Sequence, residues 1–298
     1  MKILLTGPTG FIGSAFTRLA LNRGHLVGGL IIPTEQAPTA LPANPNLVWL
    51  RGTLEQPPWS AIDTFKPDAC VHTAWITTPE IYLESPENER FRDASLQFLL
   101  KLADSGVQYV LGLGTCIEYQ IGEKPLAEDF TPIAPTTAYA RCKNELRLAL
   151  EAEAKPRQFG LCWGRVFYPY GPGEHPARLC SAITQKLLRG DTITLKTPKS
   201  TKDYIYIDDL VTALLTVVEK KFVGTLNLAT GHGTTVLDIA STLSSLVGRP
   251  ELIQQTTEPE KDPFPFVVAD ASRLKSLGWQ SAISVDEGLR RLVAVHKK

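Results

Sequence analysis

The sequence predicts an α/β fold in which a doubly wound parallel sheet carries helices on both faces, followed by a smaller, interleaved C-terminal lobe. Short apolar strand signals alternate with amphipathic helical segments through the first half of the 298-residue chain. A glycine-rich turn follows the first strand signal, and from about residue 160 the composition shifts toward Pro, Gly and aromatic residues. We therefore expect one domain at residues 1–165 and a lobe at residues 166–298, with a segment at about 203–230 returning to the sheet.

The glycine-rich turn is the first element with chemical content. A short apolar strand runs into T-G-P-T-G-F-I-G at residues 6–13, and an apolar-patterned helix and a second strand follow. Gly7 permits a tight turn, Gly10 lets the backbone approach a pyrophosphate, and Gly13 lets the helix pack closely on the strand. The N–H groups at the start of that helix attract an anion. This context predicts a Rossmann-type dinucleotide site, and the alternative is a structural strand-to-helix turn.

The end of the second strand leaves the identity of the dinucleotide open. A site for NAD expects Asp or Glu there to bind the ribose 2′-hydroxyl. The sequence instead continues through Ile32 and Pro33, with no Arg at that point to meet a 2′-phosphate. Thr34 and Glu35 lie just beyond and are candidates to substitute. The missing acidic residue favours NADP, and NAD remains open.

Tyr139 and Lys143 form a candidate proton-transfer pair. Residues four apart share one face of a helix, and the segment 138–153 has helical periodicity with Thr136 and Thr137 as candidate N-cap residues. A free tyrosine titrates near pH ~10. A neighbouring cation stabilises the phenolate and lowers the pKa of the phenol, which makes it a better acid or base at neutral pH. The alternative is a chance pair on a surface helix.

Two further strands end near this pair in the predicted sheet. Residues 68–74 and 109–113 are apolar strand signals, and ligands of parallel sheets bind outside the carboxyl ends of the strands. Thr115 follows the second of these ends and is placed to offer a hydroxyl to a substrate. His72 lies near the first end, and a hydrogen-bonded structural role is favoured over a catalytic one.

Taken together, the motifs resemble the extended short-chain dehydrogenase/reductase family, in its NAD-dependent epimerase/dehydratase branch of sugar-nucleotide epimerases and 4-ketoreductases. The resemblance covers nearly the whole chain. Its ordered blocks are T-G-x-x-G-x-I-G at 6–13, H-x-A at 72–74, S-S-x-x-V-Y at 114–119, Y-x-x-x-K at 139–143, R-x-x-N-x-Y-G-P-G at 165–173 and R-D-[FY]-[IV]-[YH]-V-x-D at 202–209.

The resemblance implies a role for each matched residue. Tyr139 would be the acid/base on a sugar hydroxyl or carbonyl, Lys143 would lower its pKa and bind the nicotinamide ribose, and Thr115 would hold a sugar oxygen. The implied contacts to NAD or NADP are Gly7, Thr9, Gly10, Phe11, Ile12, Thr34, Leu54, Thr73, Ala74, Tyr139 and Lys143. The implied contacts to a sugar-nucleotide substrate are Thr115, Cys116, Tyr168, Arg178 and Lys202. No metal site is expected.

Departures from the family pattern narrow the function. The 4,6-dehydratases of the family place Asp-Glu directly after the catalytic Thr, whereas this chain has Cys116 and Ile117. Glu118 stands one place later, where strand alternation is expected to turn it away from Thr115. The sequence therefore disfavours a dehydratase and leaves an epimerase or a 4-ketoreductase.

Two substitutions affect the expected grip on a sugar nucleotide. Tyr168 replaces an Asn that helps to hold the substrate diphosphate, and Lys202 replaces an Arg, which removes the bidentate fork for phosphate. Two alternatives stay open for this reason: an NAD(P)H-dependent reductase of a non-nucleotide carbonyl compound, and a non-catalytic dinucleotide-sensing protein.

Composition bounds the partners and the compartment. The chain has 31 basic residues (Lys plus Arg) and 31 acidic residues (Asp plus Glu). It therefore lacks the net positive charge that would indicate a nucleic-acid partner. The five cysteines form no C-x-x-C pair, which predicts reduced thiols, no zinc site and a cytoplasmic protein. No apolar run reaches the roughly 18 residues of a membrane span, and glycines interrupt the apolar start, so no signal peptide is expected. By resemblance, the helices at 88–105 and 138–153 would pair two subunits in a homodimer.

Overall fold

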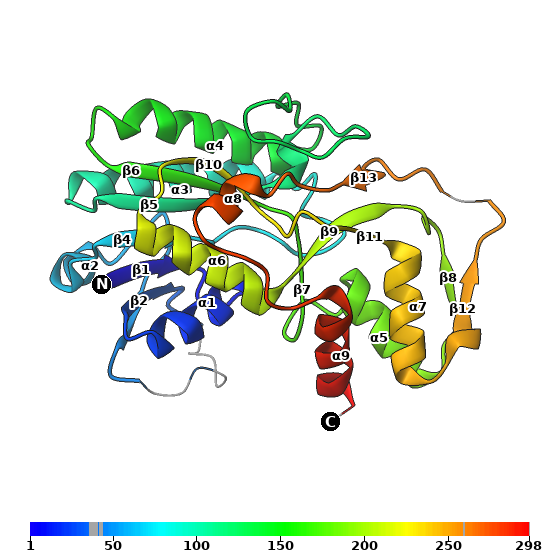
Figure 1. Cartoon of the computed structure of the whole chain (residues 1–298). Coiled ribbons are helices and arrows are strands. Elements are labelled where there is room, and N and C mark those ends of the chain that lie inside the picture. The colour runs from blue at the N-terminus through cyan, green and yellow to red at the C-terminus, as the bar shows by residue number, and fades with distance from the viewer. Residues whose placement is uncertain (36–40, 42–43, 259, 298) are drawn as a thin grey trace. The chain divides into compact units, whose positions relative to one another are not determined.

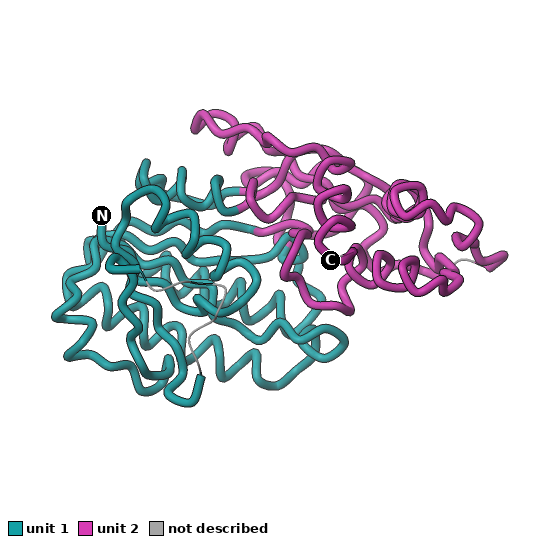
Figure 2. The backbone as a smooth tube through the Cα atoms, turned by 90° about the horizontal axis from the view of Figure 1, so that it is seen from below, with its two compact units in different colours: residues 1–118, 134–165, 211–226 teal, residues 119–133, 166–210, 227–298 magenta. Residues whose placement is uncertain are grey.

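The computed structural model describes residues 1–35, 41, 44–258 and 260–297 and divides into two compact units. Unit 1 comprises residues 1–118, 134–165 and 211–226, and unit 2 comprises residues 119–133, 166–210 and 227–298 (Figure 2). Each unit is therefore assembled from separate stretches of the chain. The assignment of cofactor binding to residues 1–165 and of substrate binding to residues 166–298 remains a prediction.

A seven-stranded sheet carries the order β10-β6-β5-β4-β1-β2-β3 (Figure 1). Its strands are β1 (Lys2–Thr6), β2 (Leu26–Ile31), β3 (Leu47–Arg51), β4 (Ala69–His72), β5 (Tyr109–Thr115), β6 (Gly160–Val166) and β10 (Gly224–Leu228). The pairs β1–β2, β2–β3, β1–β4 and β4–β5 are parallel. The strand order reverses between β1 and β4, which confirms the predicted doubly wound sheet and places its ligand edge beside these two strands.

Helices cover both faces of this sheet (Figure 1). They are α1 (Phe11–Asn22), α2 (Trp59–Phe65), α3 (Glu87–Asp104), α4 (Ala138–Ala154) and α6 (Ile207–Lys220), with a short 3₁₀ helix, η1 (Cys116–Glu118), directly after β5. The helices α3 and α4 start within one residue of the predicted helices at 88–105 and 138–153. Among the described residues, no helix combines the length and apolarity that crossing a bilayer requires.

The apolar strands form a core on each side of the sheet. Leu4 and Cys70 occupy facing positions of β1 and β4 and join a buried cluster with Phe98 of α3 and Leu146 of α4. Because successive strand side chains point to opposite faces, the equally buried Leu5 points to the other side, which α1 and α6 cover (Figure 1). Strands that are apolar on both faces are what a doubly covered parallel sheet requires.

Unit 2 contains a four-stranded sheet, a strand pair and a group of helices. The four strands are β7 (Tyr168–Tyr170), β9 (Thr201–Tyr206), β11 (Gly233–Thr235) and β13 (Phe266–Val267), and the pair is β8 (Ile193–Leu195) with β12 (Ile253–Gln255). The helices are α5 (Leu179–Arg189), α7 (Val236–Val247), η2 (Pro250–Leu252), α8 (Ser272–Ser276) and α9 (Val285–His296). Of the segment 203–230, β10 is an edge strand of the seven-stranded sheet, whereas β9 lies in the four-stranded sheet.

Candidate active site

The glycine-rich turn joins β1 to α1 and leaves no room for a side chain at Gly7 or Gly13. Gly7 has φ +67°, and the N–H of Gly10 donates to its carbonyl oxygen at 3.2 Å. A Cβ at Gly13 would overlap that same oxygen, so helix and strand meet at van der Waals distance. Gly10 is the N-cap of α1, and within the described residues no side chain caps this helix. The backbone N–H groups at the start of α1, which no side chain among the described residues caps, are suited to bind the pyrophosphate of a dinucleotide.

The end of β4 is fastened to this turn. The backbone N–H groups of Thr73 and Ala74 both donate to Thr6 Oγ1 at 3.1 Å, and Thr73 Oγ1 donates to the Thr6 carbonyl oxygen at 2.7 Å. A Cβ at Gly7 would stand 2.8 Å from Thr73 Oγ1. The structure therefore brings the predicted cofactor residues of the turn and of β4 together at one edge of the sheet.

Both ring nitrogens of His72 have hydrogen-bond partners, as its expected structural role requires. Thr6 Oγ1 lies 2.9 Å from Nδ1, and Ser95 Oγ lies 2.9 Å from Nε2. Because Thr6 Oγ1 already accepts two amide hydrogens, its own hydrogen goes to Nδ1, and Nε2 is left to donate to Ser95. Burial, and then the nearby Lys143 ammonium, lower the pKa of His72 to about 3, so the ring is neutral at physiological pH.

The substitution His72→Gln is expected to cost about 1–3 kcal/mol of unfolding free energy, because it leaves Thr6 or Ser95 without a buried partner. Urea unfolding measures this loss. The pH dependence of turnover between pH 5 and 8 should keep its shape. His25 pairs with the half-exposed Glu219, so His25→Gln is the matched control and should cost less than about 1 kcal/mol. A pH profile that changes in His72→Gln would contradict the structural role.

Tyr139 and Lys143 lie at the start of α4. Thr137 caps this helix, and its side chain accepts the N–H of Ala140 at 3.2 Å. The ammonium of Lys143 donates to the carbonyl oxygen of Leu113 at 2.7 Å and lies 6.0 Å from the centroid of the Tyr139 ring. Leu113 is two positions before Thr115 at the end of β5. The cation of the Tyr139 and Lys143 pair is therefore bonded to the strand that ends at Thr115.

Two aromatic residues that the sequence did not single out surround this pair. The Lys143 ammonium lies 3.9 Å from the centroid of the Trp75 ring. Trp75 and Tyr82 both make edge contacts with Tyr139, with ring centroids 6.5 and 5.0 Å away. Asn88 fixes the Trp75 indole by accepting from Nε1 at 2.8 Å. Trp75 directly follows the H-x-A block, so the sequence could have predicted its position beside a strand end. The sequence could not have predicted the direction of its ring.

Burial tunes the charge of Lys143. The side chain is 2% exposed, and loss of solvation lowers the pKa of Lys143 to about 7, against an opposing effect of the Glu118 carboxylate. An amine with its pKa in this range gains or loses its proton at physiological pH. The position of Lys143 between a carbonyl oxygen and an aromatic face is a perturbed environment of the kind that marks functional sites.

The expectation for Glu118 was wrong. Strand alternation was expected to turn it away from Thr115, but residues 116–118 form the 3₁₀ helix η1 rather than a strand. The chain thus folds back, and Glu118 Oε1 accepts the backbone N–H of Thr115 at 2.8 Å. Cys116, a predicted substrate contact, lies in the same turn and is 3% exposed.

The end of β2 meets a cation from the neighbouring strand. Ile31 and Arg51 are in register, and Arg51 Nη1 donates to the carbonyl oxygens of Pro33 at 3.2 Å and Glu35 at 3.0 Å. Thr34, between these two, is exposed, and the predicted contact Leu54 is buried at 9% exposure. The sequence provided no signal for Arg51, because its position depends on the pairing of β2 with β3.

The remaining predicted substrate residues belong to unit 2. Lys202 is buried and donates to Asp262 Oδ2 at 2.8 Å and to the carbonyl oxygen of Phe264, with the Tyr168 ring centroid 5.6 Å from its ammonium. Arg178 is the N-cap of α5. The ion pair with Asp262 already neutralises the Lys202 charge that a substrate phosphate would use.

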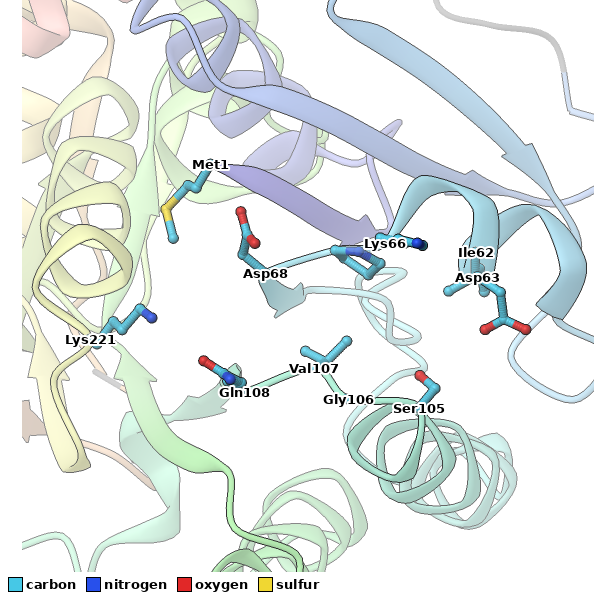
Figure 3. A pocket seen from close by; sticks show the side chains of 11 residues that line it. Met1, Ile62, Asp63, Lys66, Asp68, Ser105, Gly106, Val107, Gln108 and Lys221 are labelled. Carbon is cyan, nitrogen blue, oxygen red and sulfur yellow. The ribbon is translucent and has the colours of Figure 1, made fainter.

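A depression of about 630 Å³ in unit 1 lies away from this site (Figure 3). It is lined by Met1, Asp68 and Gln108, which precede β1, β4 and β5, and by Lys66 and Lys221. It therefore opens at the amino ends of the strands, whereas Thr115 stands at a carboxyl end. Within the part of the chain that the structure describes, no group of three or more His, Cys, Asp or Glu is placed to hold a metal ion.

Comparison with known proteins identifies the family to which the chain is similar. Residues 3–229 match the model of the NAD dependent epimerase/dehydratase family. UDP-glucuronic acid decarboxylase 1 of Danio rerio is 24% identical over 304 residues, 98% of this chain and 72% of the relative. The probable UDP-glucuronate 4-epimerase of Rhizobium meliloti is 25% identical over 330 residues, 98% and 96% of the two chains. The fold matches that of the UDP-glucose 4-epimerase of Thermus thermophilus in complex with NAD, with a TM-score of 0.88, 23% identity and coverage of 100% and 99%.

Proposed function

Because the chain belongs to the NAD-dependent epimerase/dehydratase family and is an enzyme of the extended short-chain dehydrogenase type, we propose that it carries out NAD(P)-dependent redox modification of a nucleotide-activated sugar. The modification is an epimerisation or the reduction of a 4-keto group. Named relatives that act on UDP-glucuronate, and structural neighbours that hold UDP-glucose or NAD, support the substrate class.

The residues of the site divide the proton chemistry among them. Tyr139 accepts a proton from the sugar hydroxyl during oxidation, or gives one to the carbonyl during reduction. Lys143 stabilises the phenolate form of Tyr139 electrostatically, and Thr115 orients the sugar oxygen through its hydroxyl. The turn at residues 7–13 would hold the pyrophosphate of the dinucleotide, whose nicotinamide supplies the hydride donor or acceptor when bound.

One observation carries this proposal. Lys143 donates at 2.7 Å to the carbonyl oxygen of Leu113, so a residue of α4 is tied to the strand that ends at Thr115. This bond holds the ammonium close to Tyr139, at the same edge of the sheet as the glycine turn after β1. Lys143 is only 2% exposed, and burying its ammonium costs unfolding free energy, so the contribution of Lys143 to fold stability does not explain its position.

Incubation of the purified protein with a panel of UDP-, dTDP- and CDP-sugars tests the function. An epimerase converts the sugar without net change in the cofactor, whereas a 4-ketoreductase consumes NADPH or NADH when given a 4-keto-6-deoxy sugar nucleotide. Chromatography of the nucleotide sugars detects the first outcome, and the loss of reduced-nicotinamide absorbance detects the second. If no member of the panel is converted and none causes a loss of reduced-nicotinamide absorbance, the proposal is refuted.

For the cofactor we propose NADP, because the end of β2 lacks an acidic residue and Arg51 stands beside it. The variant Arg51→Ala should raise the Kd of NADPH by about 10- to 100-fold, the value of one or two charged hydrogen bonds to a phosphate. The Kd of NADH should stay unchanged. Fluorescence titration of both cofactors measures this, with the exposed Arg23→Ala as control. Tighter binding of NADH than of NADPH by the unmodified protein would refute the assignment.

A second candidate function rests on Lys202. Lys202 was expected to hold a substrate diphosphate, but its ammonium already donates hydrogen bonds to Asp262 and to the carbonyl oxygen of Phe264. This arrangement favours a reductase of a non-nucleotide carbonyl compound. Thermal shift assays with UDP, CDP and dTDP separate the two candidates, because a ligand that binds the folded state raises Tm. A clear rise with any of them excludes the second candidate.

We further propose a cytoplasmic homodimer that pairs α3 and α4 of two subunits. Leu148 of α4 is 51% exposed, and an apolar side chain of this size is a natural contact in a helical interface. Light scattering coupled to gel filtration measures the mass of the particle. The substitution Leu148→Glu should produce monomers.

A further inference from the structure

Glu118 is a buried carboxylate that the proposed proton chemistry does not use. Its side chain is fully buried. Oε1 accepts the backbone N–H of Thr115 at 2.8 Å, and Oε2 accepts Nε of Arg165 at 2.8 Å. The indole Nε1 of Trp163 lies 3.2 Å from each oxygen. Hydrogen bonds to a charged acceptor from three different residues hold the carboxylate in a single position.

Gly114 makes the space that this carboxylate fills. A Cβ at position 114 would overlap both Glu118 Oε1 and Trp163 Nε1. The family pattern S-S-x-x-V-Y has a serine at this position and an apolar residue at position 118, whereas this chain has Gly and Glu. The two departures are therefore one structural change, because the glutamate fits only where residue 114 has no side chain.

The Glu118 carboxylate also acts on Lys143. The groups that face the Lys143 ammonium are the Leu113 carbonyl oxygen from β5, the Trp75 ring after β4, and Tyr139 from its own helix. His72 of β4 is neutral at physiological pH, since its pKa is about 3. The carboxylate of Glu118, from η1, raises the pKa of Lys143 against the larger lowering by burial. Arg165 of β6 pairs with that carboxylate.

We propose that Glu118 is a positioning residue for the Thr115, Tyr139 and Lys143 site: its carboxylate fixes the backbone at Thr115 and places a negative charge beside the strand end to which Lys143 is bonded. The catalytic part of this inference rests on the proposed function. The electrostatic part concerns the protein without substrate, so the two can be tested separately.

Two double variants separate the two actions of Glu118. Glu118→Gln/Arg165→Met removes the charge but keeps an oxygen that accepts from Thr115. Glu118→Leu/Arg165→Met removes both. Replacing Arg165 in each avoids a buried guanidinium without a counterion, which by itself could prevent folding. Proteins labelled with ¹⁵N at lysine Nζ give the pKa of Lys143 by NMR titration, with Lys143→Met to identify its signal.

Both double variants should lower the measured pKa of Lys143, because each removes the carboxylate that raises it. The Leu variant alone should lose hydrogen-exchange protection at the Thr115 amide. If the protein turns over a sugar nucleotide, the Gln variant should lower kcat about 10-fold with KM unchanged. Asp203→Asn, a buried carboxylate of unit 2, is the control and should leave the Lys143 signal where it is. An unchanged Lys143 pKa in both variants overturns the proposal, whereas absence of turnover with a lowered pKa counts only against the proposed function.

Discussion

Replacing Tyr139 by Phe should lower kcat by between about 100-fold and 10,000-fold, the usual contribution of a positioned general acid or base. The phenol oxygen is the only atom lost, so the edge contacts of the ring with Trp75 and Tyr82 remain. Binding of the dinucleotide should weaken little, because the turn at residues 7–13 is untouched. Steady-state kinetics on the sugar nucleotide identified by the panel, together with cofactor titration, measures both quantities.

Tyr109 provides the matched control for this loss. It stands at the amino end of the strand that ends at Thr115, and its hydroxyl donates to the Phe222 carbonyl oxygen at 2.6 Å. The same chemical change, Tyr109→Phe, should cost about 0.5–1.5 kcal/mol of unfolding free energy and leave kcat unchanged. If Tyr139→Phe keeps the turnover of the unmodified enzyme, Tyr139 is not the acid or base, and another group of the site transfers the proton.

The substitution Lys143→Met should have opposite effects on activity and on stability. Turnover should fall at least about 100-fold, since the cation that stabilises the phenolate of Tyr139 is removed. The unfolding free energy at neutral pH should not fall. At a pH where Lys143 of the unmodified protein is charged, the variant should be more stable, because methionine fills the space against Trp75 without desolvating an ammonium. Kinetics and urea unfolding on the same preparation test both effects.

The pH dependence of stability follows from the same lysine. The pKa of Lys143 is lowered from 10.5 to about 7 in the folded protein. Between these values the unfolded chain carries the proton and the folded protein does not, so unfolding takes up a proton and the folded state gains stability as pH rises. This gain in unfolding free energy is on the order of a few kcal/mol. It is fully present above pH 10.5, the ordinary pKa of lysine, and is lost as the pH falls through about 7.

A comparison of variants isolates this contribution from all other titrating groups. The difference in unfolding free energy between the unmodified protein and Lys143→Met should rise from pH 7 to pH 10. Lys101 lies 4.5 Å from the Trp59 ring centroid on the exposed side of α3, so Lys101→Met should show no such slope. Equal slopes in the two variants would mean that Lys143 is an ordinary solvated lysine.

Local patterns in the sequence were sufficient for the parts of the site that lie close together along the chain. The glycine turn, its helix, and the spacing of Tyr139 and Lys143 depend on backbone geometry within one or two turns, and the structure has these elements in place. The carboxyl-end position of Thr115 followed from strand order alone. These features need no knowledge of which side chains meet across the sheet.

The features that escaped prediction depend on long-range contacts. Arg51 reaches the end of β2 only because β3 pairs beside it. Glu118 reaches Thr115 because residues 116–118 form a 3₁₀ turn instead of a strand, and its carboxylate accepts from Trp163 and Arg165 on β6. Lys202 meets Asp262 sixty residues further along the chain. In each case a partner remote in sequence determines the contact, and residue patterns alone do not identify it.

The interleaving of the chain restricts how this protein can be cut or recombined. A fragment ending at residue 165 lacks residues 211–226, which belong to the same compact unit and include most of α6 and the start of β10. Such a fragment would expose β6 as a bare edge and uncover apolar side chains beneath the missing helix, a combination that promotes aggregation. Exchange of binding specificity between relatives therefore has to proceed by substitutions within the intact chain, because neither unit is encoded by one continuous piece of gene that could be transplanted.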